Sequence, residues 1–166
     1  MDIEIKAISK EINLLLWKND ETLSTAESCT GGMISSAITT FPGSSHFFKG
    51  GVISYTNEIK INVLGVGQET IDKYTEVSEQ TAREMVEGVR RLMDTTYGVA
   101  VTGFAGPGGG TAENPVGTIW IAVGDQYDVI VRKLEDNDGR EKNMARAAAV
   151  ALTMLKELLI SRQKED

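Results

Sequence analysis

Helix-like and strand-like segments alternate along most of this chain, and this alternation limits the available folds more than any other feature. Residues 3–18 carry apolar side chains at helical spacing, with lysine and glutamate between them. Strand-like runs at 22–26, 51–56 and 97–101 are separated by segments with helical patterns. Because parallel strands need a long crossover connection, this order predicts parallel strands joined by helices.

A tight hairpin near the C-terminal end interrupts this order. Residues 118–123 and 127–134 are strand-like and flank a short turn at 124–126. Strands joined so closely must be antiparallel. An amphipathic helix follows, with an apolar stripe from Met144 to Leu159. We therefore expect an α/β protein with three layers, α/β/α, and a mixed, mostly parallel sheet that includes one antiparallel strand.

Residues that cap helices mark two helix starts in the middle of the chain. Asn57 is the expected N-cap of a helix over 58–64, which would place Lys60 in the first turn of that helix. Ser78 is the expected N-cap of the next helix. The sequence also predicts a helix over 30–39 that the chain enters through glycines.

Composition is that of an ordinary globular domain. The 166 residues are 41% hydrophobic and 25% charged, close to the average for folded proteins, so we expect a single domain over residues 1–166. The formal net charge of −7 disfavours binding to a nucleic-acid backbone, which needs clustered lysine and arginine. No apolar stretch reaches the roughly 20 residues of a membrane span.

Cysteine and histidine are too rare for disulfide or metal chemistry. Cys29 is the only cysteine, and Asp2, Glu4 and Lys6 interrupt the apolar residues where a secretory signal would begin. We therefore expect a cytoplasmic protein without a membrane or nucleic-acid partner. With one histidine and no carboxylates at ligand spacing, we expect neither a metal nor another cofactor.

The segment TAESCTGG, residues 25–32, places reactive groups between a strand and a helix. The residues at this junction are Ser28, Cys29, Thr30, Gly31 and Gly32. Hydroxyls, a thiol and unpaired backbone N–H groups at a helix N-terminus can bind an anion or stabilise an oxyanion. The alternative is structural, with Ser28 or Thr30 capping the helix and the glycines allowing close packing. No Lys-Ser or Lys-Thr follows the glycines, so this is not a Walker loop.

A serine nucleophile needs a base, and the sequence offers a histidine and a lysine. The only histidine, His46, lies in a loop rich in proline, glycine and serine, where we expect it to pack against the surface. Serine–lysine hydrolases use a lysine instead. In a first helical turn Lys60 would face the positive end of the helix dipole, which favours a neutral amine, and Tyr55 can supply a hydrogen bond. The alternative for Lys60 is a solvated surface lysine.

Two later segments offer contacts to a ligand. The glycine-rich segment VTGFAGPGGGTAENPVG, residues 101–117, follows a strand and lacks the spacing of a dinucleotide-binding loop. It either approaches a ligand with its backbone or forms a mobile surface loop. Arg140, before the last helix, can pair with a phosphate or carboxylate, or be a solvated arginine at a helix end.

Four motifs follow one another in a specific order. They are TAESCTGG, GGVISYTNEIKINVLGV, VSEQTAREMVEGVR and AVTGFAGPGGGTAENPVGTIWIAV. Together they resemble the C-terminal domain of the competence-damage-inducible protein CinA, the nicotinamide-nucleotide amidohydrolase family, over about residues 5–160. The resemblance implies a three-layer α/β/α fold and hydrolysis of nicotinamide mononucleotide to nicotinic acid mononucleotide and ammonia, in pyridine-nucleotide salvage. Members are often dimers, and some carry a preceding molybdopterin-binding-like domain, for which this chain has no room.

The resemblance also implies residue roles. Ser28 matches the nucleophile of the family, and Tyr55 and Lys60 match its tyrosine and lysine. Neutral Lys60 would take the proton of Ser28, and Tyr55 would orient Lys60 or relay a proton. The implied oxyanion and ligand contacts are Thr30, Gly31 and Gly32, and the implied pocket wall is Thr102, Gly103 and Gly106.

The last helix departs from the family pattern. The usual Gly-Asp-Arg is here Asp138, Gly139 and Arg140, and Met144 stands where a second arginine is often found. The rival hypothesis is a catalytically silent module that binds a pyridine nucleotide or a protein partner. The combination of a serine, a tyrosine and a lysine at the matching positions favours the enzyme.

Overall fold

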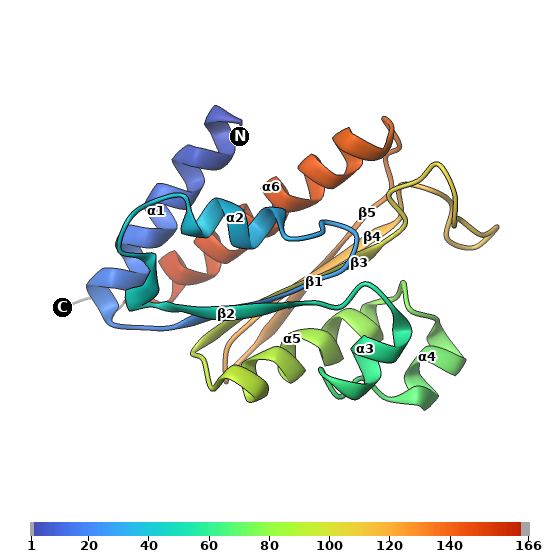
Figure 1. Cartoon of the computed structure of the whole chain (residues 1–166), viewed down its shortest axis with the longest axis horizontal. Coiled ribbons are helices and arrows are strands. Elements are labelled where there is room, and N and C mark those ends of the chain that lie inside the picture. The colour runs from blue at the N-terminus through green and yellow to red at the C-terminus, as the bar shows by residue number, and fades with distance from the viewer. Residues whose placement is uncertain (1, 164–166) are drawn as a thin grey trace.

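The computed structural model describes residues 2–163 and places one five-stranded sheet between two layers of helices (Figure 1). One face of the sheet is covered by α1 (Ile3–Asn19), α2 (Met33–Thr39) and α6 (Arg140–Ser161). On the opposite side lie α3 (Asn57–Asn62), α4 (Gln68–Tyr74) and α5 (Glu79–Met93). The predicted three-layer α/β/α architecture is confirmed.

The sheet has the strand order β2-β1-β3-β4-β5. Its strands are β1 (Leu23–Glu27), β2 (Phe48–Ile53), β3 (Tyr97–Gly103), β4 (Ile119–Gly124) and β5 (Val129–Leu134). β1 pairs in parallel with β2 and β3, whereas β4 pairs antiparallel with β3 and β5. Four strands therefore share one direction and β4 alone runs against them, as the crossovers and the hairpin predicted.

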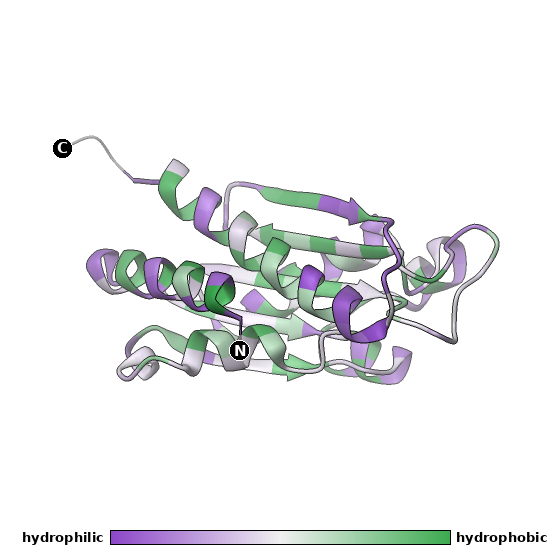
Figure 2. Ribbon diagram, turned by 90° about the horizontal axis from the view of Figure 1, so that it is seen from above, coloured by the Kyte–Doolittle hydropathy of each residue, from purple (hydrophilic) through white to green (hydrophobic). Residues whose placement is uncertain are grey.

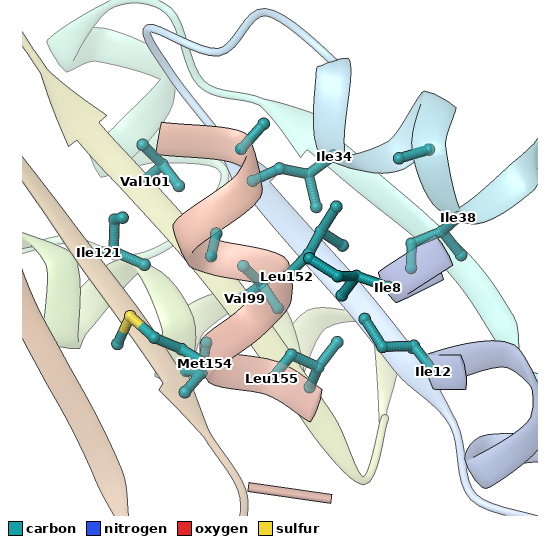
Figure 3. Packing of buried hydrophobic residues seen from close by; sticks show 14 of the residues in the cluster. Ile8, Ile12, Ile34, Ile38, Val99, Val101, Ile121, Leu152, Met154 and Leu155 are labelled. Atoms are coloured by element: carbon teal, nitrogen blue, oxygen red, sulfur yellow. The ribbon is translucent and has the colours of Figure 1, made fainter. Parts of the chain in front are cut away.

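The larger core lies between the sheet and the layer formed by α1, α2 and α6. The alternation of hydrophobic and hydrophilic residues that buries one side of a helix is visible along α1, which starts at the N label, in Figure 2. Figure 3 shows the packing of Ile8, Ile12, Ile34, Ile38, Leu152 and Leu155 against Val99, Val101 and Ile121. Small residues of α6, such as Ala148 and Ala151, are fully buried and allow this helix to lie close to the sheet.

The second core lies under α5. Met85, Val86 and Val89 of this helix are fully buried and pack with Leu64 against the sheet. Ser78 caps α5 as predicted, because its side chain accepts a hydrogen bond from the N–H of Thr81 at 3.1 Å.

Several local predictions differ from the structure. The helix expected over 30–39 begins later, as α2 at Met33–Thr39, and the strand expected over 127–134 is β5 at Val129–Leu134. β2 lies at Phe48–Ile53 instead of 51–56, because β1, its partner in the described sheet, ends where Glu27 pairs with Ile53. The N-cap of α3 is Thr56, whose hydroxyl accepts from Ile59 N at 3.3 Å, and not Asn57. The short helix α4 was not predicted.

We expect Gly88→Ala to destabilise the fold. A Cβ at Gly88, in the middle of α5, would overlap the backbone carbonyl of Leu64, which cannot move without disturbing the second core. Overpacking of this kind costs about 1–3 kcal/mol. The free energy of unfolding in urea measures the effect. Glu87→Ala, at the exposed neighbouring position, is the control, and equal stability of the two variants would contradict the prediction.

Candidate active site

A cavity of about 240 Å³ opens where the three parallel strands end. The residues that follow or end these strands line it: Ser28 after β1, Tyr55 after β2, and Thr102 and Gly103 at the end of β3. In open α/β sheets, ligands bind in the crevice outside the carboxyl ends of the strands, where the crossovers diverge to opposite faces. Here the crossover from β1 to β2 contains α2, and the one from β2 to β3 contains α5 on the other face.

Lys60 and Ser28 meet in this cavity. The Nζ atom of Lys60 lies 3.2 Å from the Oγ atom of Ser28 and donates to the carbonyl oxygen of Ser54 at 2.9 Å. The side chain of Lys60 comes from α3, on the α5 side of the sheet, and only 2% of the residue is exposed. The two residues, 32 positions apart in the sequence, are thus within hydrogen-bond distance, as the resemblance implied.

Burial lowers the pKa of Lys60, because desolvation disfavours the charged amine. Glu76 and Cys29 oppose this shift electrostatically. The helix dipole, which the sequence suggested as the cause, is not the physical reason. α3 has only six residues, and Lys60 lies in its last turn, where the dipole offers no positive end.

The backbone holds Ser28 in place from two directions. Its N–H donates to the Val101 carbonyl on β3 at 3.0 Å, and its own carbonyl accepts from Gly31 N at 3.0 Å. The adjacent Cys29 also lines the cavity, but burial raises the pKa of its thiol to about 12. A thiol that stays protonated at neutral pH is a poor nucleophile, so the environment favours Ser28.

The start of α2 is occupied by a carboxylate of the chain itself. Glu27, which is 1% exposed, accepts hydrogen bonds from Thr30 Oγ1 at 2.7 Å and from Ile34 N at 2.9 Å. Its second oxygen accepts from Ser35 N at 3.0 Å and Ser35 Oγ at 2.6 Å. The anion site expected at this helix start is therefore filled from within.

For the same reason Thr30, Gly31 and Gly32 do not line the cavity, a correction to the contacts expected from the sequence. The hydroxyl of Thr30 turns to Glu27. The two glycines have φ values of 60° and 108° and carry the chain from Ser28 into α2. They adjoin a different, mainly apolar hollow near Ile5 of α1.

Tyr55 and Arg140 form a bridge at the rim of the cavity. The Nη2 atom of Arg140 donates to the Tyr55 hydroxyl at 2.8 Å, and its Nη1 atom donates to the Gly106 carbonyl at 2.8 Å. Tyr55 is 56% exposed. We expected Tyr55 to contact Lys60. The Tyr55 hydroxyl instead binds Arg140, the first residue of α6.

The residues expected to form the pocket wall lie together at the cavity. Thr102, Gly103 and Gly106 all line the cavity, and Thr102 Oγ1 donates to the Glu76 carbonyl at 2.6 Å. Gly106 has a φ of 86°, and a Cβ there would overlap the side chain of Val116. Glycine at this position therefore lets the loop between β3 and β4 fold back on itself beside the site.

Sequence reasoning missed several residues of the wall. Asn57, Glu76, Val77 and Phe104 line the cavity as well. Glu76 and Val77 lie in the turn between α4 and α5. Because α4 was not predicted, the sequence did not place this turn at the site. The only signal was the polar character of Thr75 and Ser78, which is typical of a helix boundary.

Other groups do not enter the site. His46 stacks on Trp17, with ring centroids 4.1 Å apart, and lies 3.2 Å from the carboxylate of Asp20, which agrees with the packing role expected for it. Over residues 2–163, no group of three or more possible metal ligands comes together. Within the same span, none of the helices is both long and apolar enough to cross a bilayer.

We expect Glu27→Gln to destabilise the protein by about 1–3 kcal/mol, because a side-chain amide would turn an N–H group toward buried donors that now bind a carboxylate. Chemical denaturation of this variant measures the loss. Glu87→Gln makes the same charge change at an exposed position and serves as the control. If both variants unfold at the same denaturant concentration, the carboxylate does not hold the helix start.

Comparisons with known proteins give the family of this chain. A family model described as the CinA C-terminal domain matches residues 5–159. A CinA-like protein of Amoebophilus asiaticus is 44% identical over 152 residues, which cover 92% of this chain and 36% of that protein. A CinA-like protein of Thermotoga neapolitana is 45% identical over 148 residues, which cover 89% of this chain and 36% of that protein.

A solved structure agrees with these matches. The crystal structure of a competence/damage inducible protein from Agrobacterium tumefaciens superposes with a TM-score of 0.92 at 37% identity, covering 95% of this chain and 99% of that one. The chain spans about a third of the length of the two curated relatives, 36% in each case. From the family model, the sequence identities and the common fold, we conclude that this chain belongs to the CinA C-terminal domain family.

Proposed function

We propose that this chain is a serine amidohydrolase that converts nicotinamide mononucleotide to nicotinic acid mononucleotide and ammonia. The observation that carries the proposal is the 3.2 Å distance between Lys60 Nζ and Ser28 Oγ inside a cavity. An amine with a lowered pKa beside a serine hydroxyl is the arrangement that nucleophilic catalysis requires. The mononucleotide as substrate follows from the four motifs that resemble the family.

In the first step neutral Lys60 accepts the proton of Ser28 while Oγ attacks the carboxamide carbon. Its amine already donates to the Ser54 carbonyl at 2.9 Å, which leaves the nitrogen lone pair free to face the hydroxyl. The product of the attack is a tetrahedral intermediate with a negative oxygen. Donors aimed at such an oxygen typically contribute about 3 kcal/mol each.

The backbone N–H of Cys29 is the donor best suited to that oxygen. It follows the nucleophile directly, on a residue that lines the cavity. Within residues 2–163 this N–H donates to no other residue, and its one interaction is with the thiol of its own side chain. It takes the place of the donors expected from Thr30 to Gly32. In that segment the Thr30 hydroxyl donates to Glu27, which also accepts from Ile34 N at the start of α2.

In the remaining steps the proton returns. Protonated Lys60 donates it to the leaving nitrogen, the carbon–nitrogen bond breaks, and ammonia leaves behind a nicotinoyl ester on Ser28. Water then attacks this ester, with Lys60 again as the base, and releases the carboxylate product. Tyr55 and Arg140 lie at the rim, where the guanidinium can meet the phosphate of the mononucleotide. Met144, at the position where the family often has a second arginine, supplies no further cation.

The first test is the release of ammonia from nicotinamide mononucleotide. We expect turnover by the unchanged chain, a loss of at least about a thousandfold in kcat with Ser28→Ala, and a similar loss with Lys60→Arg, because a guanidinium does not give up its proton. Cys29→Ala is the matched control and should retain most of the activity. Full turnover by Ser28→Ala would refute the nucleophile. Thermal stabilisation by the mononucleotide without product would instead support a silent binding module.

The second test uses pH. Because only the neutral amine accepts a proton, kcat/KM should rise with pH through the lowered pKa of Lys60 and then level off. The same shift affects stability. Folded Lys60 loses its proton below its ordinary value of 10.5, so the unfolded chain binds more protons between the two pKa values. Wild-type stability relative to Lys60→Met should therefore increase as pH rises through that window. A constant difference would show that burial does not penalise the charged amine.

A further inference from the structure

The cavity carries one carboxylate for which the proposed reaction has no use. Glu76, in the turn between α4 and α5, is the only acidic residue among those described that line the cavity. Over residues 2–163 its carboxylate forms no hydrogen bond or ion pair with another side chain or backbone group. The residue is half-buried and forms part of the cavity wall.

The backbone around Glu76 is fixed by several hydrogen bonds. The Glu76 carbonyl accepts from Thr102 Oγ1 at 2.6 Å. The carbonyl of Thr75, one residue earlier, accepts from Thr81 Oγ1 at 2.8 Å and from Ser78 Oγ at 3.1 Å. Thr75 has a φ of 72°, a conformation that a β-branched residue adopts only when its surroundings hold it there. The placement of Glu76 is therefore maintained against local backbone strain.

Glu76 acts against the base that the proposed reaction needs. Its negative charge raises the pKa of Lys60, in opposition to burial. A carboxylate at this position thus makes the neutral amine scarcer and does not help to activate Ser28. Over residues 2–163 no lysine or arginine forms an ion pair with this carboxylate, so it stays available to a positive charge that enters the cavity.

We propose that Glu76 is a specificity-determining residue that selects a substrate whose ring is positively charged. This inference rests on the proposed function and names the part of the substrate that the site reads. In nicotinamide mononucleotide the ring nitrogen is quaternary and cationic, and the carboxamide that Ser28 would attack is attached to the same ring. A carboxylate that interacts with Lys60, the neighbour of Ser28, is within electrostatic range of that ring.

The charges of the cavity wall suit such a ligand. Glu76 offers a negative group to the ring, and Arg140 offers a positive group at the rim to the phosphate. A charge pair contributes more in a cavity that shields it from water than on an open surface. A neutral pyridine ring with the same carboxamide would gain nothing from Glu76 and would leave its carboxylate without a partner.

The test compares two ligands that differ in ring charge. They are nicotinamide mononucleotide and its reduced dihydro form, whose ring is neutral, and calorimetry measures both dissociation constants. Ser28→Ala supplies a background without turnover. In that background we expect the charged ligand to bind about tenfold more tightly than the reduced one. Addition of Glu76→Gln should reduce the ratio to about twofold or less, whereas addition of the exposed Glu87→Gln should leave it unchanged.

Each other outcome overturns the inference. A ratio that survives Glu76→Gln, an equal loss of affinity for both ligands, or no binding of either ligand all exclude charge selection by Glu76. Turnover measurements on the unchanged chain separate this result from the proposed function. If ammonia is released but Glu76→Gln leaves the ratio of the two dissociation constants unchanged, only the role of Glu76 is refuted. If Glu76→Gln lowers that ratio but no ammonia is released, only the proposed hydrolysis is refuted.

Discussion

The buried carboxylate of Glu27 is the contact on which the geometry of the site depends. A carboxylate that is 1% exposed is costly unless its lone pairs are satisfied, and here four donors from Thr30, Ile34 and Ser35 satisfy it. These bonds fix where β1 ends and how α2 begins. Ser28 is the next residue along the chain, so its direction is set by the same contacts. The hydrogen bonds to Glu27 thus hold the segment that carries the Ser28 hydroxyl.

A second constraint is the balance of charge around Lys60. Burial lowers the pKa of its amine, and the Glu76 carboxylate works in the opposite direction. A site with the lysine alone would keep a larger share of the amine neutral, but it would present only positive groups to a ligand with a cationic ring. Glu76 and Arg140 give the cavity both signs of charge. In our proposal, Glu76 reduces the share of Lys60 that is neutral, and it also binds the cationic ring of the substrate.

Much of the fold could be predicted because its signals are local. The helical spacing from Ile5 to Leu16 became α1, and the Ser78 cap became the start of α5. The close spacing of β4 and β5 required an antiparallel pair. Errors occurred where partners decide the boundary, as at β2, whose end is set by the end of β1. The short helix α4, seven residues long, has too few turns for a periodic pattern to stand out.

For the candidate site, the sequence by itself determined the groups that we propose to react: a serine at a strand end, and a lysine and a tyrosine in one short segment, Ser28, Lys60 and Tyr55. Tertiary structure alone decided which groups surround them. Glu27 fills the anion site that the helix start offered, Arg140 replaces Lys60 as the partner of Tyr55, and Glu76 joins the cavity. The reason is physical: covalent neighbours and helical periodicity are written in the chain, whereas desolvation and contacts between distant segments exist only after the layers have packed.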